Sequence, residues 1–382
     1  MAVKKKILFI TGTRADYGKL KPLLKAIEAS SNFENYIFVS GMHLLAQYGN
    51  TYNEVLKDNY KNVYVAFGLE HSSSMSINLG NTIKQLTGYV AHVKPDMIIV
   101  HGDRLDALAG AVVGALNNIL VAHIEGGEVS GTIDESIRHA VSKFCHIHFT
   151  CNSEASKRLL QLGENSDTVY EIGSPDIDIM LSGLLPDIDE VKRYYGLPFN
   201  NYCILMYHPV TTEYSRVAEN IKQVIDAVIK SKRNYVIIYP NNDLGSEIIL
   251  NEYNRVKNNE HVRMFPSLRF EYFLTLLKHA DCIIGNSSAG IRESCVYGIP
   301  AIDIGTRQSG RYDLKKMSNI QHVTEDTAQI LSALKCLENY RLVSKHFGEG
   351  TSTEMFMEAL NNPNLWDIKI QKRFIDLGEI NV

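Results

Sequence analysis

HGDRLDALAGAVVGALNNILVAHIEGGEVSGTIDESIRH, residues 101–139, is the stretch that decides the fold. Short apolar runs with β-branched residues lie at Met97–Val100 and Ile119–Ile124, as expected for parallel strands that are covered on both faces. A helix over Ala107–Leu116 is expected between them, so the pattern predicts a strand–helix–strand unit. Ligands of open α/β sheets bind beyond the carboxyl ends of such strands.

Both strands end in polar turns that contain glycine. Asp103 follows the first strand, Glu125 follows the second, and Asp134 lies near the start of a helix expected over Glu135–Lys143. A single aspartate at such a place is ordinarily a helix N-cap. Asp103, Glu125 and the adjoining Gly-Gly pair together indicate a crevice for proton transfer on a polar substrate.

Alternating strands and helices continue through the whole chain of 382 residues, of which 45% are hydrophobic. Residues 182–198 interrupt the pattern with two glycines, two prolines and several acidic residues, which is typical of a domain boundary. We therefore expect two α/β domains, 1–181 and 182–363. The expected strands are Lys6–Thr11, Tyr36–Ser40, Met97–Val100, Ile119–Ile124, His146–Thr150 and Val169–Ile172 in the first domain, and Cys203–Tyr207, Tyr235–Tyr239, Val262–Phe265, Asp281–Ile284 and Ala301–Ile304 in the second.

Charge and cysteine usage exclude several classes of protein. The net charge is −4 and no basic stripe is present, so no nucleic-acid partner is expected. No window approaches about 18 consecutive apolar residues, so no membrane span is expected. The apolar run Ile7–Ile10 is too short for a signal peptide, and the six cysteines form no CxxC pair. These features predict a cytoplasmic protein with free thiols.

Several further strand ends carry groups suited to a phosphate. Gly12-Thr13-Arg14 joins the first strand to a helix and resembles a phosphate turn, with Arg14 and Lys19 supplying charge, although it is neither GxGxxG nor a Walker loop. In the second domain the corresponding tips are His208–Thr212, the Gly285–Gly290 turn and the loop with Arg307. Each kind of turn also has a structural alternative. The first could be only a tight strand–helix connection, the Gly285–Gly290 turn could cap a helix, and Arg307 could be a solvated surface arginine.

The tripeptide Asp176-Ile177-Asp178 has the form of the metal-binding DxD of some sugar transferases. Asp187-Ile188-Asp189 repeats the pattern without any partner ligands, so the tripeptide alone indicates little. We expect no metal site and no cofactor.

In order along the chain, GTRADYGKL (12–20), GMHL (41–44), HGDR (101–104), HIEGGEVSGTIDESIRH (123–139), GSPD (173–176), HPVTT (208–212), GNSSAGIRE (285–293) and GTRQSGR (305–311) resemble one family. This family is the hydrolysing UDP-N-acetylglucosamine 2-epimerases of sialic acid synthesis. The resemblance implies two Rossmann-like domains that face each other across a cleft, as in GT-B glycosyltransferases. It also implies that the C-terminal segment, 364–382, packs back on the first domain.

The resemblance implies anti elimination of UDP to 2-acetamidoglucal, followed by addition of water to give N-acetylmannosamine. It assigns acid–base work to Asp103, Glu125 and Asp134, and assigns the leaving diphosphate to Arg14, His208, Ser287 and Ser288. Glu293 is expected on the uridine ribose. The predicted catalytic residues are Asp103, Glu125, Asp134 and His208, and the predicted substrate-binding residues are Arg14, Asp16, Lys19, His43, Arg104, Gly173, Asp178, Ser287, Ser288, Glu293 and Arg307.

The expected partners are UDP-N-acetylglucosamine and UDP, and a homodimer or homotetramer is expected. One alternative is a hydrolysing epimerase of UDP-2,4-diacetamido-2,4,6-trideoxyglucose in the legionaminic acid pathway. A GT-B glycosyltransferase and a nucleotide-sugar sensor without turnover are two others. Three carboxylates in the first domain argue against the sensor.

Overall fold

The computed structural model describes residues 4–72 and 74–376, which form two compact units. The first unit takes in the chain up to Glu128, then Asp134–Leu181, then the chain from Phe347. The second unit consists of Val129–Ile133 and Ser182–His346. The loop between Glu125 and Asp134 therefore contributes its middle to the second unit.

The chain passes from the first to the second unit within the 182–198 interval, directly after Leu181. It rejoins the first unit at Phe347, earlier than the expected segment 364–382. Residues 377–382 of that expected segment lie outside the described residues. The earlier return adds a whole helix to the first unit, as described below.

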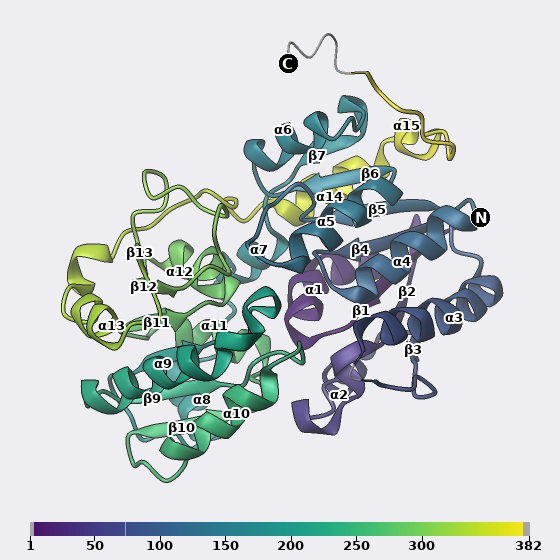
Figure 1. Cartoon of the computed structure of the whole chain (residues 1–382). Coiled ribbons are helices and arrows are strands. Elements are labelled where there is room, and N and C mark those ends of the chain that lie inside the picture. Colours follow the sequence, from purple (N-terminus) through teal and green to yellow (C-terminus); the bar gives the residue numbers. More distant parts are fainter. Residues whose placement is uncertain (1–3, 73, 377–382) are drawn as a thin grey trace. The chain divides into compact units, whose positions relative to one another are not determined.

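The first unit contains a seven-stranded sheet in the order β3-β2-β1-β4-β5-β6-β7, and all of its paired strands are parallel (Figure 1). The chain order reverses between β1 and β4, and this reversal is the switch point at which α/β sheets bind ligands. The strands are β1 (Lys5–Thr11), β2 (Phe33–Val39), β3 (Val63–Val65), β4 (Met97–His101), β5 (Leu120–Ile124), β6 (Ile147–Thr150) and β7 (Val169–Glu171).

Both faces of this sheet are covered by helices, which explains its nearly continuous apolar strands. In β1, Ile7 and Phe9 belong to the core on one face, whereas Leu8 and Ile10 belong to the core on the other. Phe356, which is fully buried, adds the returning chain to the first of these cores. The helices are α1 (Arg14–Ala29), α2 (Tyr52–Lys57), α3 (Met75–Val93), α4 (Leu105–Leu116), α5 (Ile133–Phe144), α6 (Ser153–Gln161), α7 (Pro175–Leu181), α14 (Ser352–Asn361) and α15 (Pro363–Trp366).

The second unit contains a six-stranded parallel sheet in the order β10-β9-β8-β11-β12-β13. Counted within the unit, this is the same strand order as in the first six strands of the other sheet, with a switch point between β8 and β11. The strands are β8 (Cys203–Met206), β9 (Tyr235–Ile238), β10 (Val262–Phe265), β11 (Cys282–Gly285), β12 (Ala301–Ile304) and β13 (Ile320–Val323).

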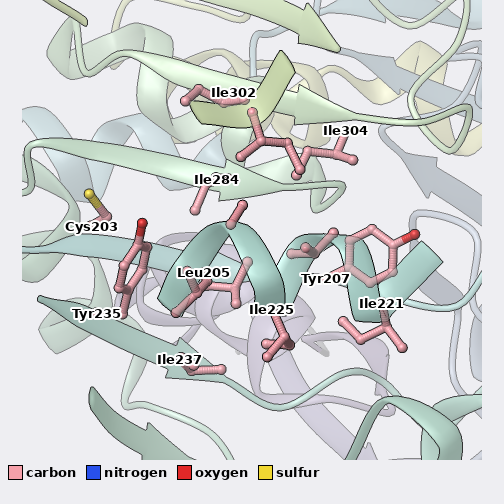
Figure 2. Close-up of a cluster of buried hydrophobic side chains, with 14 of the residues drawn as sticks. Cys203, Leu205, Tyr207, Ile221, Ile225, Tyr235, Ile237, Ile284, Ile302 and Ile304 are labelled. Carbon is pink, nitrogen blue, oxygen red and sulfur yellow. The ribbon is translucent and has the colours of Figure 1, made fainter. Parts of the chain in front are cut away.

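One core of this unit lies between the sheet and α9. Figure 2 shows Leu205 and Ile284 of neighbouring strands in one cluster with Ile221 and Ile225 of α9. Each of these four side chains is at most 1% exposed, and full burial of such a side chain contributes about 1.5–3 kcal/mol. The helices are α8 (Ile188–Tyr195), α9 (Val217–Ser231), α10 (Ser246–Tyr253), α11 (Phe270–Lys278), α12 (Arg292–Tyr297) and α13 (Thr327–Ala333).

The predicted α/β class is confirmed, and the strands that the sequence predicted are present. Two edge strands, β3 and β13, were not predicted. All six cysteines are free thiols, and of these only Cys336 is exposed. None of the helices in the described part of the chain combines the length and the apolar character that crossing a membrane would need.

Candidate active site

Glu125 follows β5 in a left-handed backbone conformation, with φ at 63°. A residue other than glycine in this region costs about 1–3 kcal/mol, so surrounding contacts must hold it. Its amide donates to Phe149 O at 2.8 Å, and its carbonyl accepts from Arg138 Nη1 at 2.5 Å. The main chain of Glu125 is thus fixed from both sides.

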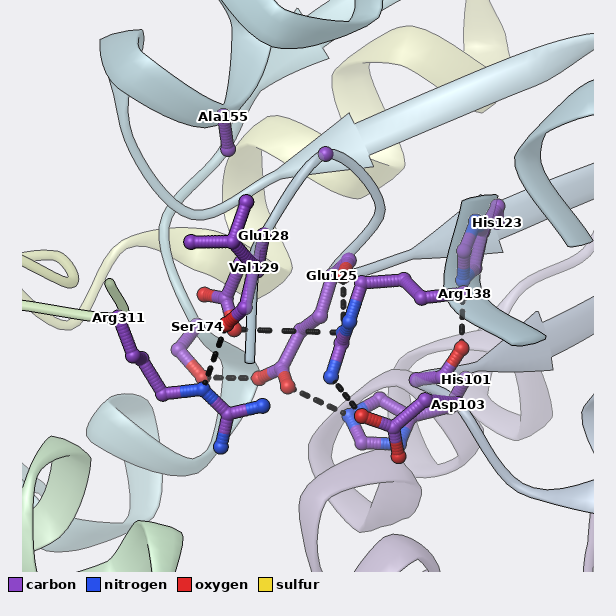
Figure 3. A network of polar contacts seen from close by, with 12 residues as sticks. His101, Asp103, His123, Glu125, Glu128, Val129, Arg138, Ala155, Ser174 and Arg311 are labelled. Atoms are coloured by element: carbon purple, nitrogen blue, oxygen red, sulfur yellow. Dashed lines mark hydrogen bonds and ion pairs between the residues drawn. The ribbon is translucent and has the colours of Figure 1, made fainter. Parts of the chain in front are cut away.

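Glu125 is 3% exposed, and its carboxylate lies among polar groups from three parts of the chain, of which Figure 3 shows Ser174 and His101. Oε1 accepts a hydrogen bond from Ser174 and lies 3.6 Å from Lys19 Nζ. Oε2 lies 3.1 Å from His101 Nε2, without the alignment of a hydrogen bond. Lys19 Nζ is also 3.4 Å from Oδ2 of Asp176. One lysine therefore faces two buried carboxyl groups.

Arg138 of α5 brings the acidic residues of two strand ends together, and its side chain is 4% exposed. Its Nη2 binds the Asp103 carboxylate, and its Nη1 lies 4.0 Å from Glu128 Oε2 in addition to binding the carbonyl of Glu125. Because a guanidinium donates in a fixed fork, it sets the orientation of Asp103 relative to the backbone of Glu125. Figure 3 shows these contacts as dashed lines.

Asp134 lies in the first turn of α5 and is 7% exposed. It stands four residues before Arg138, and side chains at this spacing lie on the same helix face. One helix therefore carries both the predicted third carboxylate and the arginine that binds Asp103.

His123 and Asp106 contact the turns that follow the strands near these carboxylates. His123 Nε2 lies 2.8 Å from the carbonyl of Gly102, and burial lowers the pKa of its imidazole to about 3, so it is neutral. Ser40 donates to the buried Asp106, and burial raises the pKa of Asp106 to about 6. A Cβ at Gly12 would lie 2.0 Å from Asp106 Oδ2, so only glycine permits this approach.

Three of the predicted substrate-binding residues also make hydrogen bonds within the protein, and their role in binding substrate stays a prediction. Asp16 completes the capping box of α1 and accepts from the amide of Gly12 at 3.0 Å. His43 is fully buried between the hydroxyls of Thr11 and Thr51, and burial lowers its pKa to about 4.

The third is Asp178, which accepts from the amides of Ser352 and Thr353 at 3.0 and 2.7 Å. It therefore caps the N-terminus of α14, which has four otherwise unsatisfied amides. Gly173 also has a packing role, since a Cβ there would lie 3.0 Å from Ser352 Oγ. The sequence pattern did not distinguish such capping from ligand binding.

The predicted basic residues of the first unit lie at strand ends around the switch point. Arg14 is the first residue of α1, directly after β1, and Arg104 precedes α4, directly after β4. Both are half-buried, whereas Lys19 is 7% exposed and contacts Glu125 and Asp176. Lys19 therefore belongs to the carboxylate cluster in this structure.

The second unit has its polar groups at the β8/β11 switch point. Asn286, fully buried after β11, accepts from the amide of His208 at 2.7 Å and donates to its carbonyl at 2.9 Å. His208 Nδ1 accepts from the amide of Asn241 at 3.0 Å. A neutral His208 therefore carries its proton on Nε2 and can donate it there.

The remaining predicted residues of this unit surround the same turn. Ser287 caps the 3-10 turn Ser288–Gly290 by accepting from Ala289 N at 3.3 Å, and Glu293 is 4% exposed in α12. Arg307 is 7% exposed, and its Nη1 donates to the carbonyl of Asn286 at 3.2 Å. Part of the predicted cationic group is therefore used to hold the turn.

His101, Ser174, Asp176 and Asn286 were not predicted as site residues. Each lies in a motif that the sequence singled out, but the motif did not show which side chain faces which. Within residues 4–72 and 74–376, no three His, Cys, Asp or Glu side chains are grouped as metal ligands. Asp176 and Asp178 bind separate partners, so the DxD interpretation finds no support.

Comparison with known proteins identifies related sequences over nearly the whole chain. A family model described as UDP-N-acetylglucosamine 2-epimerase matches residues 25–361. A UDP-N-acetylglucosamine 2-epimerase of Neisseria meningitidis is 50% identical over 379 residues, which cover 98% of this chain and 100% of the relative.

More distant relatives have related names. A UDP-N,N'-diacetylbacillosamine 2-epimerase (hydrolyzing) of Legionella pneumophila is 32% identical, over 93% of this chain and 95% of the relative. A polysialic acid biosynthesis protein P7 of Escherichia coli is also 32% identical, over 80% of each chain. A Methanocaldococcus jannaschii UDP-GlcNAc 2-epimerase solved with UDP-GlcNAc and UDP is similar in fold, with a TM-score of 0.81 over 93% of this chain and 99% of that one, at 21% identity.

Proposed function

We propose that this chain, which belongs to the UDP-N-acetylglucosamine 2-epimerase family, is a hydrolysing member of that family. Its product would supply sialic acid biosynthesis. It would convert UDP-N-acetylglucosamine and water into N-acetylmannosamine and UDP. The observation that carries the proposal is that one buried arginine, Arg138, binds both the carboxylate of Asp103 and the backbone carbonyl of Glu125, beyond the ends of β4 and β5. The 50% identity to the Neisseria meningitidis enzyme supports the same nucleotide sugar.

The chemistry of the sugar explains why clustered carboxylates are needed. The C2 proton beside an acetamide is barely acidic, so a base removes it only as the C1–O bond breaks. The site must stabilise positive charge at C1 and negative charge on the departing diphosphate together. In this proposal Asp103, Glu125 and Asp134 serve the sugar, both in the elimination and in the later addition of water.

The diphosphate is assigned to groups that donate hydrogen bonds. His208 is suited to this role because its backbone and Nδ1 are fixed, which leaves the Nε2 proton as the donor. Ser287, Ser288 and Arg14 complete the proposed diphosphate set, Arg104 and Arg307 remain proposed substrate contacts, and Glu293 is assigned to the ribose hydroxyls.

Incubation with UDP-N-acetylglucosamine alone tests the reaction. We expect release of UDP and N-acetylmannosamine without an acceptor, and in D₂O the sugar should carry deuterium at C2. In ¹⁸O-labelled water, the UDP should stay unlabelled because the C1–O bond breaks. Label in the β-phosphate, with C2 unexchanged, would instead show hydrolysis at phosphorus. A glycosyltransferase would need an acceptor.

Substitutions of the carboxylates test the assignment of roles. Glu125→Gln, Asp103→Asn and Asp134→Asn should each lower kcat by about 10²–10⁴-fold, the usual contribution of a positioned acid or base, and leave UDP affinity nearly unchanged. Glu171→Gln, which alters an exposed glutamate of β7, is the matched control. Near-native turnover of Glu125→Gln would refute the central assignment.

The 32% identity to the Legionella pneumophila enzyme favours one second candidate, a diacetamido-trideoxyhexose substrate. The same incubation with the UDP-linked diacetamido sugar compares the two directly. A kcat/KM higher for the diacetamido sugar would transfer the proposal to that substrate while retaining the mechanism.

A further inference from the structure

Ser174 contacts two buried carboxylates at once. Its Oγ is at hydrogen-bond distance from Oε1 of Glu125 and from Oδ1 of Asp176, the second residue of α7. Ser174 and Asp176 are each 1% exposed, and Glu125 is 3% exposed. The three groups form a continuous row, Glu125–Ser174–Asp176, in which the two ends carry titratable oxygens.

The number of protons in this row is limited. A serine hydroxyl has one hydrogen to donate and otherwise only accepts, whereas an ionised carboxylate can only accept. Ser174 can therefore donate to one of the two carboxylates. Its contact with the other is a hydrogen bond only when that carboxyl carries a proton and donates it to Oγ.

The balance of charge leads to the same count. Lys19 Nζ lies 3.6 Å from Glu125 and 3.4 Å from Asp176, so one ammonium faces two carboxyl groups in a buried place. An uncompensated buried charge is unfavourable, and such sites take up a proton instead. One proton shared by the two carboxyls makes the cluster neutral.

We propose that Asp176 stores a proton for Glu125 and exchanges it through the hydroxyl of Ser174. The inference rests on the proposed function, in which Glu125 transfers protons at the sugar. When Glu125 is ionised, the protonated Asp176 donates to Ser174, and Ser174 donates to Glu125. As the proton of Asp176 moves to Ser174 Oγ, the proton of Ser174 moves to Glu125, and Asp176 becomes ionised. No charge enters or leaves the row.

This exchange suits a reaction that adds a proton and removes one in sequence. Elimination and hydration need the same carboxylate cluster first in one protonation state and then in the other, inside a site with little access to solvent. The exchange with Asp176 lets Glu125 face the sugar either ionised or protonated without first exchanging a proton with water, and a proton that Glu125 takes from the sugar or gives to it in one step is returned in the other step. Asp176 thus acts through Ser174 and Glu125 and is a positioning residue, not one that contacts the sugar.

His101 provides the rival location for the proton, because its Nε2 lies 3.1 Å from the other oxygen of Glu125. An imidazolium there would also neutralise the cluster. Arg138, on the carbonyl of Glu125, faces the carboxylate of Asp103 and lies 4.0 Å from that of Glu128. These acidic groups offset the charge of the arginine, so the test distinguishes Asp176 from His101 as the place of the proton.

Infrared spectroscopy of the full chain without substrate separates the two locations. We expect the difference spectrum of native protein minus Asp176→Asn, at neutral pH, to show the C=O stretch of one protonated carboxyl. The buried Asp106 is common to both proteins and cancels. The band should persist when the same difference spectrum is recorded with His101→Gln present in both proteins. A difference spectrum without a carboxyl band, or a band lost in His101→Gln, overturns the proposal.

Kinetics supply the second test. Ser174→Ala and Asp176→Asn should each lower kcat by about 10²-fold with little change in KM, and Ser174→Thr, which keeps the hydroxyl, should recover most of the rate. Ser156→Ala is the matched control, because Ser156 is a part-buried serine of the same unit that pairs with Thr150 at 2.7 Å. Native-like kcat in Ser174→Ala overturns the relay.

The two proposals fail separately. Absence of UDP release by the native protein would refute the proposed function, and it would leave the infrared result, which needs no substrate, to stand or fall by itself. Normal turnover without a carboxyl band would refute the relay alone. Fluorescence of Trp366, the only tryptophan, checks that each variant is folded.

Discussion

Replacing Arg138 tests the arrangement of the site most directly. Arg138→Met removes the positive charge beside Asp103 and Glu128, and it removes the hydrogen bond to the carbonyl of the strained Glu125. Breaking a buried ion pair by removing one partner typically costs about 3–5 kcal/mol. Because the Asp103 side chain is 16% exposed and so partly solvated after the change, we expect the lower end, about 3 kcal/mol.

Arg138→Lys separates stability from catalysis. A lysine keeps the charge but offers a single flexible ammonium, which cannot bind Asp103 and the carbonyl of Glu125 with the geometry of the guanidinium. The variant should lose less stability than Arg138→Met and still lose kcat, by about 10²-fold, because Asp103 and Glu125 are no longer held relative to each other.

Urea unfolding followed by Trp366 fluorescence measures the stability change. Trp366 lies in α15 of the first unit, where its ring stacks on Phe33 at 5.9 Å, so its emission reports on the unit that contains Arg138. Lys57→Met is the control, because it removes a surface pair with Glu54, which is worth about 0–1 kcal/mol. If Arg138→Met matched this control in stability, the arginine would not hold the site together.

Three further predictions concern other parts of the chain. Burial favours the neutral form of Glu164, but His148 and Lys372 outweigh burial and lower its pKa from 4.5 to about 2. The ionised carboxylate therefore contributes fully to the free energy of unfolding above pH 4.5, and this contribution is lost as the pH falls toward 2. Lys372→Met raises the pKa of Glu164 in the folded protein and should destabilise the protein by about 2 kcal/mol at pH 7. Urea titrations should show that this difference shrinks below pH 4.5, and Lys369→Met is the control. Gly285→Ala should lower the free energy of unfolding by about 3 kcal/mol in thermal unfolding, because the φ of Gly285 is 128° and the new Cβ would lie 2.0 Å from Met206 O. Gly196→Ala is the control and should cost about 1 kcal/mol, because the φ of Gly196 is 59° and no atom lies within 4 Å of the new Cβ. Turnover should survive EDTA, because Arg14, His208 and the serines are proposed to bind the diphosphate, and activity restored by Mg²⁺ or Mn²⁺ would contradict this.

Burial of Lys372 lowers its own pKa despite the attraction of Glu164. The desolvated lysine therefore opposes part of the stabilisation that the Glu164 shift alone would indicate. This is why we expect about 2 kcal/mol from Lys372→Met and not the full loss typical of a buried pair.

The central strands were predictable because burial on both faces gives them continuous apolar sequences, as in Met97–His101. The same argument placed Asp103 and Glu125 at one edge of the sheet. It failed for β3, whose three residues are only partly buried, and for β13, where Gln321 and His322 interrupt the apolar run at the sheet edge. Edge strands lack one neighbour, so their sequences carry a weaker signal.

Contacts between distant residues account for what the sequence did not show. The Asp178 carboxylate caps a helix that begins 174 residues later, and a local pattern contains no sign of that partner. Likewise Ser174 reaches Glu125 across 49 residues, because β5 and the chain that leaves β7 end at the same edge of one sheet. The residue types at such positions are visible in the sequence, but their pairing depends on the completed fold.

The backbone of Glu125 shows why function and local stability oppose each other at this site. Its left-handed φ would be free of strain in glycine, and glycines follow directly at positions 126 and 127. A glutamate there costs about 1–3 kcal/mol, and the fold meets this cost with the amide bond to Phe149 and the guanidinium of Arg138. Those contacts would be unnecessary for a turn alone. They become understandable when the carboxylate of Glu125 must meet His101, Lys19 and Ser174, each from a different element, in one fixed orientation.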